Sequence, residues 1–231
     1  MKKVAVALVC LLPLGLQAAK VDTLQVKSPS MNKSIEVVVV SPDVAVTKAC
    51  PVIYLLHGYG GNARTWVGIK PDLPKIADEK GIFFVCPDGK NTWYWDSPLN
   101  ADVRYETFIS NELVKYVDSH YKTVADRKGR AITGLSMGGH GAMWNGLRHS
   151  DVFSAAGSTS GGVDIRPFPK NWEMSVQIGE KAKYPENWEK YTVINLVPTL
   201  RKDQIALIFD CGDSDFFLEV NKNCLLYTSP S

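Results

Sequence analysis

Short apolar runs, each closed by a polar or Gly/Pro turn, recur along the chain. An uninterrupted apolar run of this kind is typical of a strand buried on both faces of a parallel sheet. The runs span 52–56, 82–86, 130–133, 152–156 and 205–209. Two earlier stretches, 21–26 and 34–40, are rich in β-branched residues and predict two further strands.

Helical patterns lie between these strands. Residues 105–121 carry apolar side chains at helical spacing, with charged residues such as Glu106 between them, and residues 142–148 predict a second helix. Alternating strands and helices predict one α/β domain, with a mostly parallel central sheet and helices on both faces. Residues 160–200, rich in Trp, Pro and Lys, predict either a cap-like insertion beside the functional site or an ordinary surface excursion.

The stretch from Ile132 to Gly141 contains the pattern G-x-S-x-G between a predicted strand and a predicted helix. In α/β-hydrolases this pattern is the nucleophile elbow, a turn so tight that the serine is strained and its oxygen is exposed. Gly134 and Gly138 leave room for such a turn because they lack a Cβ atom. The pattern therefore predicts an α/β-hydrolase with Ser136 as its nucleophile.

An acyl-transfer serine also needs an orienting acid, a base and an oxyanion hole. In this fold the acid follows the nucleophile along the chain. Four acidic residues stand after the last predicted strand: Asp210, Asp213, Asp215 and Glu219. We choose Asp215, with Asp213 as the alternative. The backbone N–H groups of Tyr59 and Met137 are the predicted oxyanion donors, and His57 is expected to order the Tyr59 loop rather than to act as base.

Five segments together resemble a known family. They are L-L-H-G-Y-G-G-N, P-D-G-K-N-T-W-Y-W-D-S-P, Y-E-T-F-I-S-N-E-L-V-K-Y-V-D-S-H-Y-K-T, G-L-S-M-G-G-H-G-A and D-C-G-D-S-D-F-F. Over most of residues 33–223 the chain resembles the esterase D-type α/β-hydrolases, which include feruloyl and acetyl-xylan esterases, S-formylglutathione hydrolases and mycolyltransferases. It is most similar to the exported bacterial feruloyl-esterase branch. The resemblance implies Ser136 as nucleophile, Asp215 as triad acid, Tyr59 and Met137 as oxyanion donors, and neither a metal nor an organic cofactor.

The resemblance implies a serine carboxylic-ester hydrolase that cleaves feruloyl or acetyl groups from plant cell-wall polysaccharide through an acyl-Ser136 intermediate. Its partner would be a small-molecule or polysaccharide ester. One alternative is an esterase like S-formylglutathione hydrolase, or an acyltransferase. Another is a non-catalytic glycan-binding module on a hydrolase fold.

A candidate substrate-binding segment follows the strand predicted over 82–86. Trp93, Trp95 and Asp96 lie after this strand end, where such sheets place ligand crevices. Aromatic rings there can stack on a phenolic acyl group or a sugar ring. The alternative is that two of the three aromatic residues at 93–95 belong to the core.

The base of the triad has no candidate in this chain. All four histidines precede Asp215, at positions 57, 120, 140 and 149, whereas the family's base follows the acid. We therefore expect the last strand, the last helix and the catalytic histidine to be missing. Such a chain should be nearly inactive, and the strand at 205–209 should be an edge prone to aggregation.

The last eight residues resemble a translated sequencing-library adapter. Residues 224–231 read C-L-L-Y-T-S-P-S and interrupt an amphipathic helix that begins at Phe217. We therefore expect a hydrolase domain over 20–223, followed by a non-native tail over 224–231.

The first nineteen residues predict a secretory signal peptide. Lys2 and Lys3 precede an apolar run, and Gln17-Ala18-Ala19 offers a small-residue cleavage site. This predicts a secreted or periplasmic protein without membrane insertion after cleavage, because the run is too short to span a bilayer. The full chain has 26 basic and 24 acidic residues, so removing the two lysines leaves 24 of each. A neutral chain indicates no nucleic-acid partner, and the sequence gives no oligomeric state.

The spacing of the cysteines matches no zinc site. Cys50, Cys86 and Cys211 lie within or beside apolar strands, where a free cysteine is usually a small core residue. Export would allow one pair of them to oxidise, and the sequence leaves that pair open.

Overall fold

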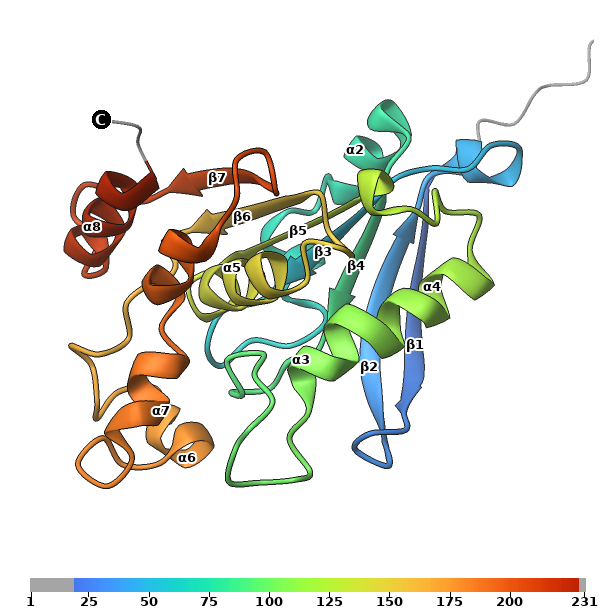
Figure 1. Ribbon diagram of the computed structural model, residues 1–231. Coiled ribbons are helices and arrows are strands. Elements are labelled where there is room, and N and C mark those ends of the chain that lie inside the picture. The colour runs from blue at the N-terminus through green and yellow to red at the C-terminus, as the bar shows by residue number, and fades with distance from the viewer. Residues whose placement is uncertain (1–18, 229–231) are drawn as a thin grey trace, which may run out of the picture.

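A computed structural model describes the backbone of residues 19–228 and the side chains through residue 224. Its centre is a seven-stranded sheet in the order β1-β2-β4-β3-β5-β6-β7 (Figure 1). The strands are β1 (Lys20–Ser28), β2 (Lys33–Ser41), β3 (Val52–Leu56), β4 (Phe83–Pro87), β5 (Arg130–Leu135), β6 (Ala155–Thr159) and β7 (Ala206–Asp210). The β1–β2 and β2–β4 pairs are antiparallel, and all the others are parallel. The predicted α/β-hydrolase class with a mostly parallel sheet is confirmed.

Helices cover both faces of this sheet. They are α1 (Thr65–Ile69), α2 (Leu73–Lys80), α3 (Tyr105–Thr107), α4 (Val114–His120), α5 (Met137–Arg148), α6 (Met174–Ile178), α7 (Pro185–Lys190) and α8 (Leu218–Thr228). A π-helical turn, Phe108–Leu113, joins α3 to α4. Figure 1 shows α3, α4 and α5 on one side of the sheet and α2 on the other. Short 3-10 helices span Asp43–Val46, Arg127–Gly129 and Val193–Thr199.

The core has two parts, one on each face of the sheet. The larger part lies under α3, α4 and α5 and contains fully buried aromatic residues such as Tyr54, Phe108 and Trp144. The smaller part lies under α2, where Leu73 and Ala77 meet apolar side chains of β2 and β4. Helix α5 packs on β5 and β6 in the larger part, so the turn between β5 and α5 is anchored in the larger core.

Six of the predicted strands agree with the structure to within two residues at each end. The strand predicted over 152–156 is instead formed at Ala155–Thr159. The N–H groups of Val152 and Phe153 donate to the carbonyl oxygen of His149, at 2.9 and 3.0 Å. The first part of this apolar run therefore closes the C-terminus of α5, and only its end enters the sheet.

The segment between β6 and β7 packs into the main core. It carries α6 and α7, and its Trp188 is fully buried. Tyr191 stacks on Trp144 of α5, with ring centroids 5.1 Å apart. Because its aromatic residues complete the core, this insertion is more than a surface excursion.

Strand β7 is an outer strand of the sheet and is poorly covered. Ile208 is 69% exposed. An apolar groove of about 190 Å³ runs beside it over β5 and β6, and its lining includes Ala131, Ala155 and Gly157. The predicted edge position of this strand is confirmed, and its tendency to aggregate stays a prediction.

Helix α8 begins at Leu218, as the amphipathic pattern predicts, and continues to Thr228. The expected interruption at residue 224 is wrong, because Cys224 is buried within this helix. The non-native origin of residues 224–231 stays a prediction.

The predicted signal peptide lies outside the described residues except for Ala19, whose N–H donates to Asp78 Oδ2 at 2.7 Å. Between residues 19 and 228, no helix is long and apolar enough to cross a bilayer. The thiols of Cys50, Cys86 and Cys211 are free in this structure, and the first two are buried.

Candidate active site

Ser136 occupies the strained turn that the sequence pattern predicts. It stands between β5 and α5 with φ 57° and ψ −117°, a conformation that side-chain-bearing residues rarely adopt. Its N–H donates to the carbonyl oxygen of Thr159 on β6, at 2.9 Å. A Cβ atom on Gly138 would lie 2.2 Å from the Leu56 carbonyl oxygen, and one on Gly134 would lie 2.3 Å from Gly138. Both glycines are therefore required by close backbone approach.

The loop after β3 passes directly beside the nucleophile. A Cβ atom on Gly58 would lie 3.5 Å from the Cβ atom of Ser136, so the main chain that leads into Tyr59 runs beside the Ser136 side chain. Within residues 19–228, neither the N–H of Tyr59 nor that of Met137 donates a hydrogen bond to another residue. Two unused N–H groups that flank a serine are what an oxyanion hole requires.

His57 is buried at the base of this loop and both its ring nitrogens are in use. The N–H of Gly89 donates to Nε2 at 2.9 Å, so Nε2 carries no proton. The proton is therefore on Nδ1, which donates to the Gly58 carbonyl oxygen at 2.7 Å. The expectation that His57 orders the loop agrees with these contacts, and a ring engaged in this way is not placed to act as base.

The predicted triad acid lies in the turn after β7. Asp215 is partly buried, and its Oδ1 accepts a hydrogen bond from the N–H of Phe217 at 2.7 Å. The alternative acid, Asp213, is exposed and accepts from the Ser214 hydroxyl at 3.2 Å. Of the two carboxylates, that of Asp215 is less exposed and accepts the shorter hydrogen bond. Neither contacts a histidine in the described structure.

The other three histidines are also engaged away from Ser136. His120 Nδ1 bonds to the Tyr116 carbonyl oxygen at 2.8 Å, and His149 Nε2 bonds to Glu106 at 2.9 Å. His140 is fully buried, and burial lowers its pKa to about 4. No histidine in the described part of the chain is in the place of a triad base.

His140 links α5 to two flanking loops. Its Nε2 accepts from the indole N–H of Trp95 at 3.0 Å, and its Nδ1 bonds to the Gly162 carbonyl oxygen at 2.8 Å. The ring is therefore neutral, with the proton on Nδ1. It holds the 88–96 segment and the start of the insertion against the first turns of the nucleophile helix.

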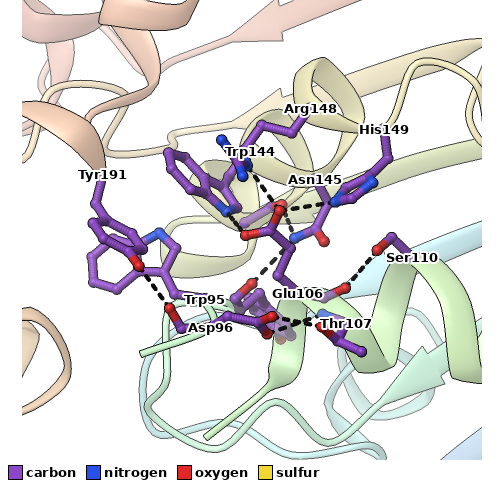
Figure 2. Close-up of polar contacts among 12 residues, drawn as sticks. Trp95, Asp96, Glu106, Thr107, Ser110, Trp144, Asn145, Arg148, His149 and Tyr191 are labelled. Carbon is purple, nitrogen blue, oxygen red and sulfur yellow. Dashed lines mark hydrogen bonds and ion pairs between the residues drawn. The ribbon is translucent and has the colours of Figure 1, made fainter. Parts of the chain in front are cut away.

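The predicted substrate-binding residues are placed differently from expectation. Trp93 and Trp95 are 1% and 0% exposed and stack on each other at 5.5 Å. Neither presents a free ring face, so both are core residues here, as the alternative interpretation holds. Asp96 accepts from the N–H and the hydroxyl of Thr107 at 3.0 and 2.6 Å (Figure 2). It anchors the start of the α3 helix rather than facing a substrate.

A buried carboxylate that the sequence pattern placed on a polar face holds α3 to α5. Figure 2 shows Glu106 at the centre of this network. Its carboxylate accepts from Trp144 Nε1 at 2.7 Å, Arg148 Nε at 2.8 Å and His149. Burial raises the pKa of Glu106, but the hydrogen bonds from His149 and Arg148 outweigh it and hold that pKa below its usual value. The sequence signal that could have indicated this partner set was the closeness of three hydrogen-bonding side chains, Trp144, Arg148 and His149, at the predicted helix 142–148.

The donor sets of the described residues do not resemble a metal site. No three His, Cys, Asp or Glu side chains of residues 19–228 are grouped so as to hold an ion.

Comparison with known proteins points to esterases. The family model Esterase, described as "Putative esterase", matches residues 28–229. Among curated relatives, Esterase Rv1288 of Mycobacterium tuberculosis is 33% identical over 123 residues, which are 50% of this chain and 26% of that protein. An acetyl esterase of Caldicellulosiruptor saccharolyticus is 26% identical over 189 residues, 74% of this chain and 68% of the relative. This chain thus spans about a quarter of the first relative's length.

A solved structure gives a fuller match. A ferulic acid esterase superposes with a TM-score of 0.74 at 29% identity, over 92% of this chain and 86% of that one. The superposition leaves out less than a tenth of this chain.

Proposed function

The chain belongs to the esterase family, and from this premise we propose that it is a serine esterase that cleaves feruloyl or acetyl esters of plant cell-wall polysaccharide. The observation that carries the proposal is the strained Ser136, set against the Gly58 loop with two unused N–H groups beside it. The likeness to a ferulic acid esterase and to an acetyl esterase supports the two acyl groups. The predicted signal peptide supports an exported enzyme that meets an extracellular substrate.

The reaction follows from the positions of these groups. Ser136 Oγ attacks the ester carbonyl carbon, and the carbonyl oxygen becomes an anion that the N–H groups of Tyr59 and Met137 stabilise. The alcohol leaves, and an acyl-Ser136 ester remains. Water then attacks this ester through the same oxyanion and releases the acid. In this scheme Asp215 orients the base that takes the serine proton.

The base is the part that this chain does not supply. All four histidines are engaged elsewhere, so we propose that the base comes from native sequence that continues after position 223 in the natural gene. Loss of the triad histidine costs on the order of a million-fold in kcat in a serine protease. The chain of 231 residues should therefore hydrolyse esters very slowly.

The test is to recover the full reading frame from the source DNA and express it without residues 1–19. Methyl ferulate and p-nitrophenyl acetate are assayed with the parent, with Ser136→Ala, and with Ser119→Ala, at an exposed position on α4, as the control. We expect hydrolysis by the parent and the control that is lost in Ser136→Ala, and the ratio of the two rates identifies the preferred acyl group. Absence of hydrolysis by a folded full-length protein would overturn the proposal and favour a glycan-binding module.

A further inference from the structure

The loop that follows β4 supports the loop of residues 57–61 after β3, which carries Tyr59 and is called the oxyanion loop below. Tyr94 is fully buried, and its hydroxyl donates to the carbonyl oxygen of His57 at 3.0 Å. The same loop supplies the Gly89 N–H that fixes the His57 ring through Nε2. Residues 89–94, which are distant from His57 in the sequence, therefore fix both its ring and its main-chain carbonyl group.

His57 in turn sets the direction of the peptide that carries the first oxyanion donor. Its Nδ1–H donates to the Gly58 carbonyl oxygen at 2.7 Å, and the N–H of Gly61 donates to the same oxygen at 3.0 Å. Because a trans peptide is planar, fixing the Gly58 carbonyl also fixes the N–H of Tyr59 on the opposite side. A chain of hydrogen bonds thus runs from the Tyr94 loop to the Tyr59 N–H.

Tyr94 also packs on the helix that carries the second donor. A Cβ atom on Gly141 of α5 would lie 2.4 Å from the Tyr94 ring, and Asn145 Nδ2 donates to the Tyr94 carbonyl oxygen at 3.3 Å. Trp93 and Tyr94 have φ values of 57° and 60°. Two consecutive aromatic residues keep such a conformation only where their surroundings hold it. Tyr94 is therefore held rigidly between the two halves of the oxyanion hole.

We propose that Tyr94 is a positioning residue of the oxyanion hole: its hydroxyl holds the His57 carbonyl so that the Tyr59 N–H stays aimed beside Ser136. This inference rests on the proposed serine esterase function. It gives a role to the W-Y-W segment other than substrate contact. Removing the hydroxyl should loosen the 57–59 main chain while leaving the core packing of the ring in place.

Tyr54→Phe is a matched control. Tyr54 lies on β3, the strand that leads into the same loop, and its buried hydroxyl has no hydrogen-bond partner in the described structure. Both variants delete one buried phenolic oxygen, but only Tyr94→Phe removes a bond to the oxyanion loop. In the full-length enzyme we expect Tyr94→Phe to lower kcat for p-nitrophenyl acetate about tenfold, less than the loss of a donor outright, with KM unchanged. Tyr54→Phe should leave both constants within about twofold.

A second readout needs no turnover. In the amide NMR spectrum of the 231-residue chain, Tyr94→Phe should shift the Tyr59 resonance and speed its hydrogen exchange, and Tyr54→Phe should do neither. Equal kcat values for the two variants, or an unmoved Tyr59 amide, would overturn the inference. If the parent enzyme shows no Ser136-dependent hydrolysis, the proposed function fails, and the Tyr59 amide still decides the positioning role.

Discussion

The two halves of the candidate site differ in how they are held. The nucleophile half comprises the β3 loop, the β5–α5 turn and the 88–96 segment, and its side chains His57, Tyr94 and His140 are almost fully buried with their polar atoms bonded. The acid half comprises β7 and the turn that carries Asp215. There Ile208 and the ring beside the acid, Phe216, are 69% and 63% exposed.

This difference shows that the candidate nucleophile and oxyanion donors are fixed by contacts from several distant segments, whereas the candidate acid is held mainly by its own turn. Ser136 and its glycines sit where main chains touch. Within residues 19–228, the only hydrogen bond that the Asp215 carboxylate accepts comes from the N–H of a residue two positions later. The two halves should therefore respond very differently to matched changes.

Glycine substitution gives the largest expected contrast. Gly138→Ala places a methyl group 2.2 Å from the Leu56 carbonyl oxygen, whereas Gly212→Ala in the acid half meets its nearest atom at 3.8 Å. We expect Gly138→Ala to lower the free energy of unfolding by about 3 kcal/mol or more, because backbone cannot move aside cheaply. Gly212→Ala should stay within about 0.5 kcal/mol. Urea denaturation measures both, and equal losses would contradict the comparison.

The buried His140 should make stability depend on pH. Its folded pKa of about 4 lies below the ordinary value of 6.5, so between these values the unfolded chain binds more protons. The contribution of the neutral His140 ring to the free energy of unfolding is therefore fully present above about pH 6.5. It falls by about 3 kcal/mol as the pH is lowered towards 4. Urea midpoints between pH 7 and pH 5 measure the slope. His140→Gln should reduce it, and His120→Gln, at an exposed site, should not; an unchanged slope in His140→Gln would refute this assignment.

The Glu106 carboxylate gives a smaller contrast. Glu106→Gln keeps the shape but leaves Arg148 and His149 without a charged partner, and we expect a loss of about 2 kcal/mol in the free energy of unfolding. The matched change Asp213→Asn, at an exposed carboxylate in the acid half, should cost less than about 0.5 kcal/mol. Thermal or urea unfolding of both variants tests this. An unchanged free energy of unfolding in Glu106→Gln would show that the network does not hold α3 to α5.

The exposed edge strand predicts the smallest change in stability. Ile208→Lys adds charge at a side chain that is already 69% exposed, so the free energy of unfolding should change by no more than about 0.5 kcal/mol. Self-association should fall, because a charged edge strand resists pairing. Sedimentation velocity measures the self-association of the parent chain, of Ile208→Lys and of Val21→Lys, whose exposed side chain lies on β1 at the opposite edge of the sheet. A parent chain that stays monomeric at high concentration would contradict the prediction.

Local patterns were sufficient for six of the seven strands and for the strained turn at Ser136. Apolar runs locate the strands because burial on both faces leaves no polar positions, and the glycines at 134 and 138 locate the elbow because only glycine fits there. Patterns failed where contacts join distant segments. Glu106 looks like a solvent-facing residue of a helix until Trp144, Arg148 and His149 are brought to it.

The aromatic segment after β4 shows the same limit. Trp93 and Trp95 follow a strand end, which in this fold class favours a ligand site. Their burial depends on the insertion between β6 and β7. There the carbonyl oxygen of Trp172, 79 positions further along the chain, accepts the Trp93 indole N–H at 3.0 Å. Neither residue's own sequence neighbourhood contains that information.

We propose that the nucleophile half is complete and that no residue of the 231-residue chain serves as its base. Added imidazole tests it directly, because a small external base can take the Ser136 proton in place of a histidine. The measurement is hydrolysis of p-nitrophenyl acetate at rising imidazole concentration by the chain and by Ser136→Ala. We predict a rate that rises with imidazole in the parent above the rate in the variant. Identical rates at every imidazole concentration would contradict a preassembled nucleophile and oxyanion hole.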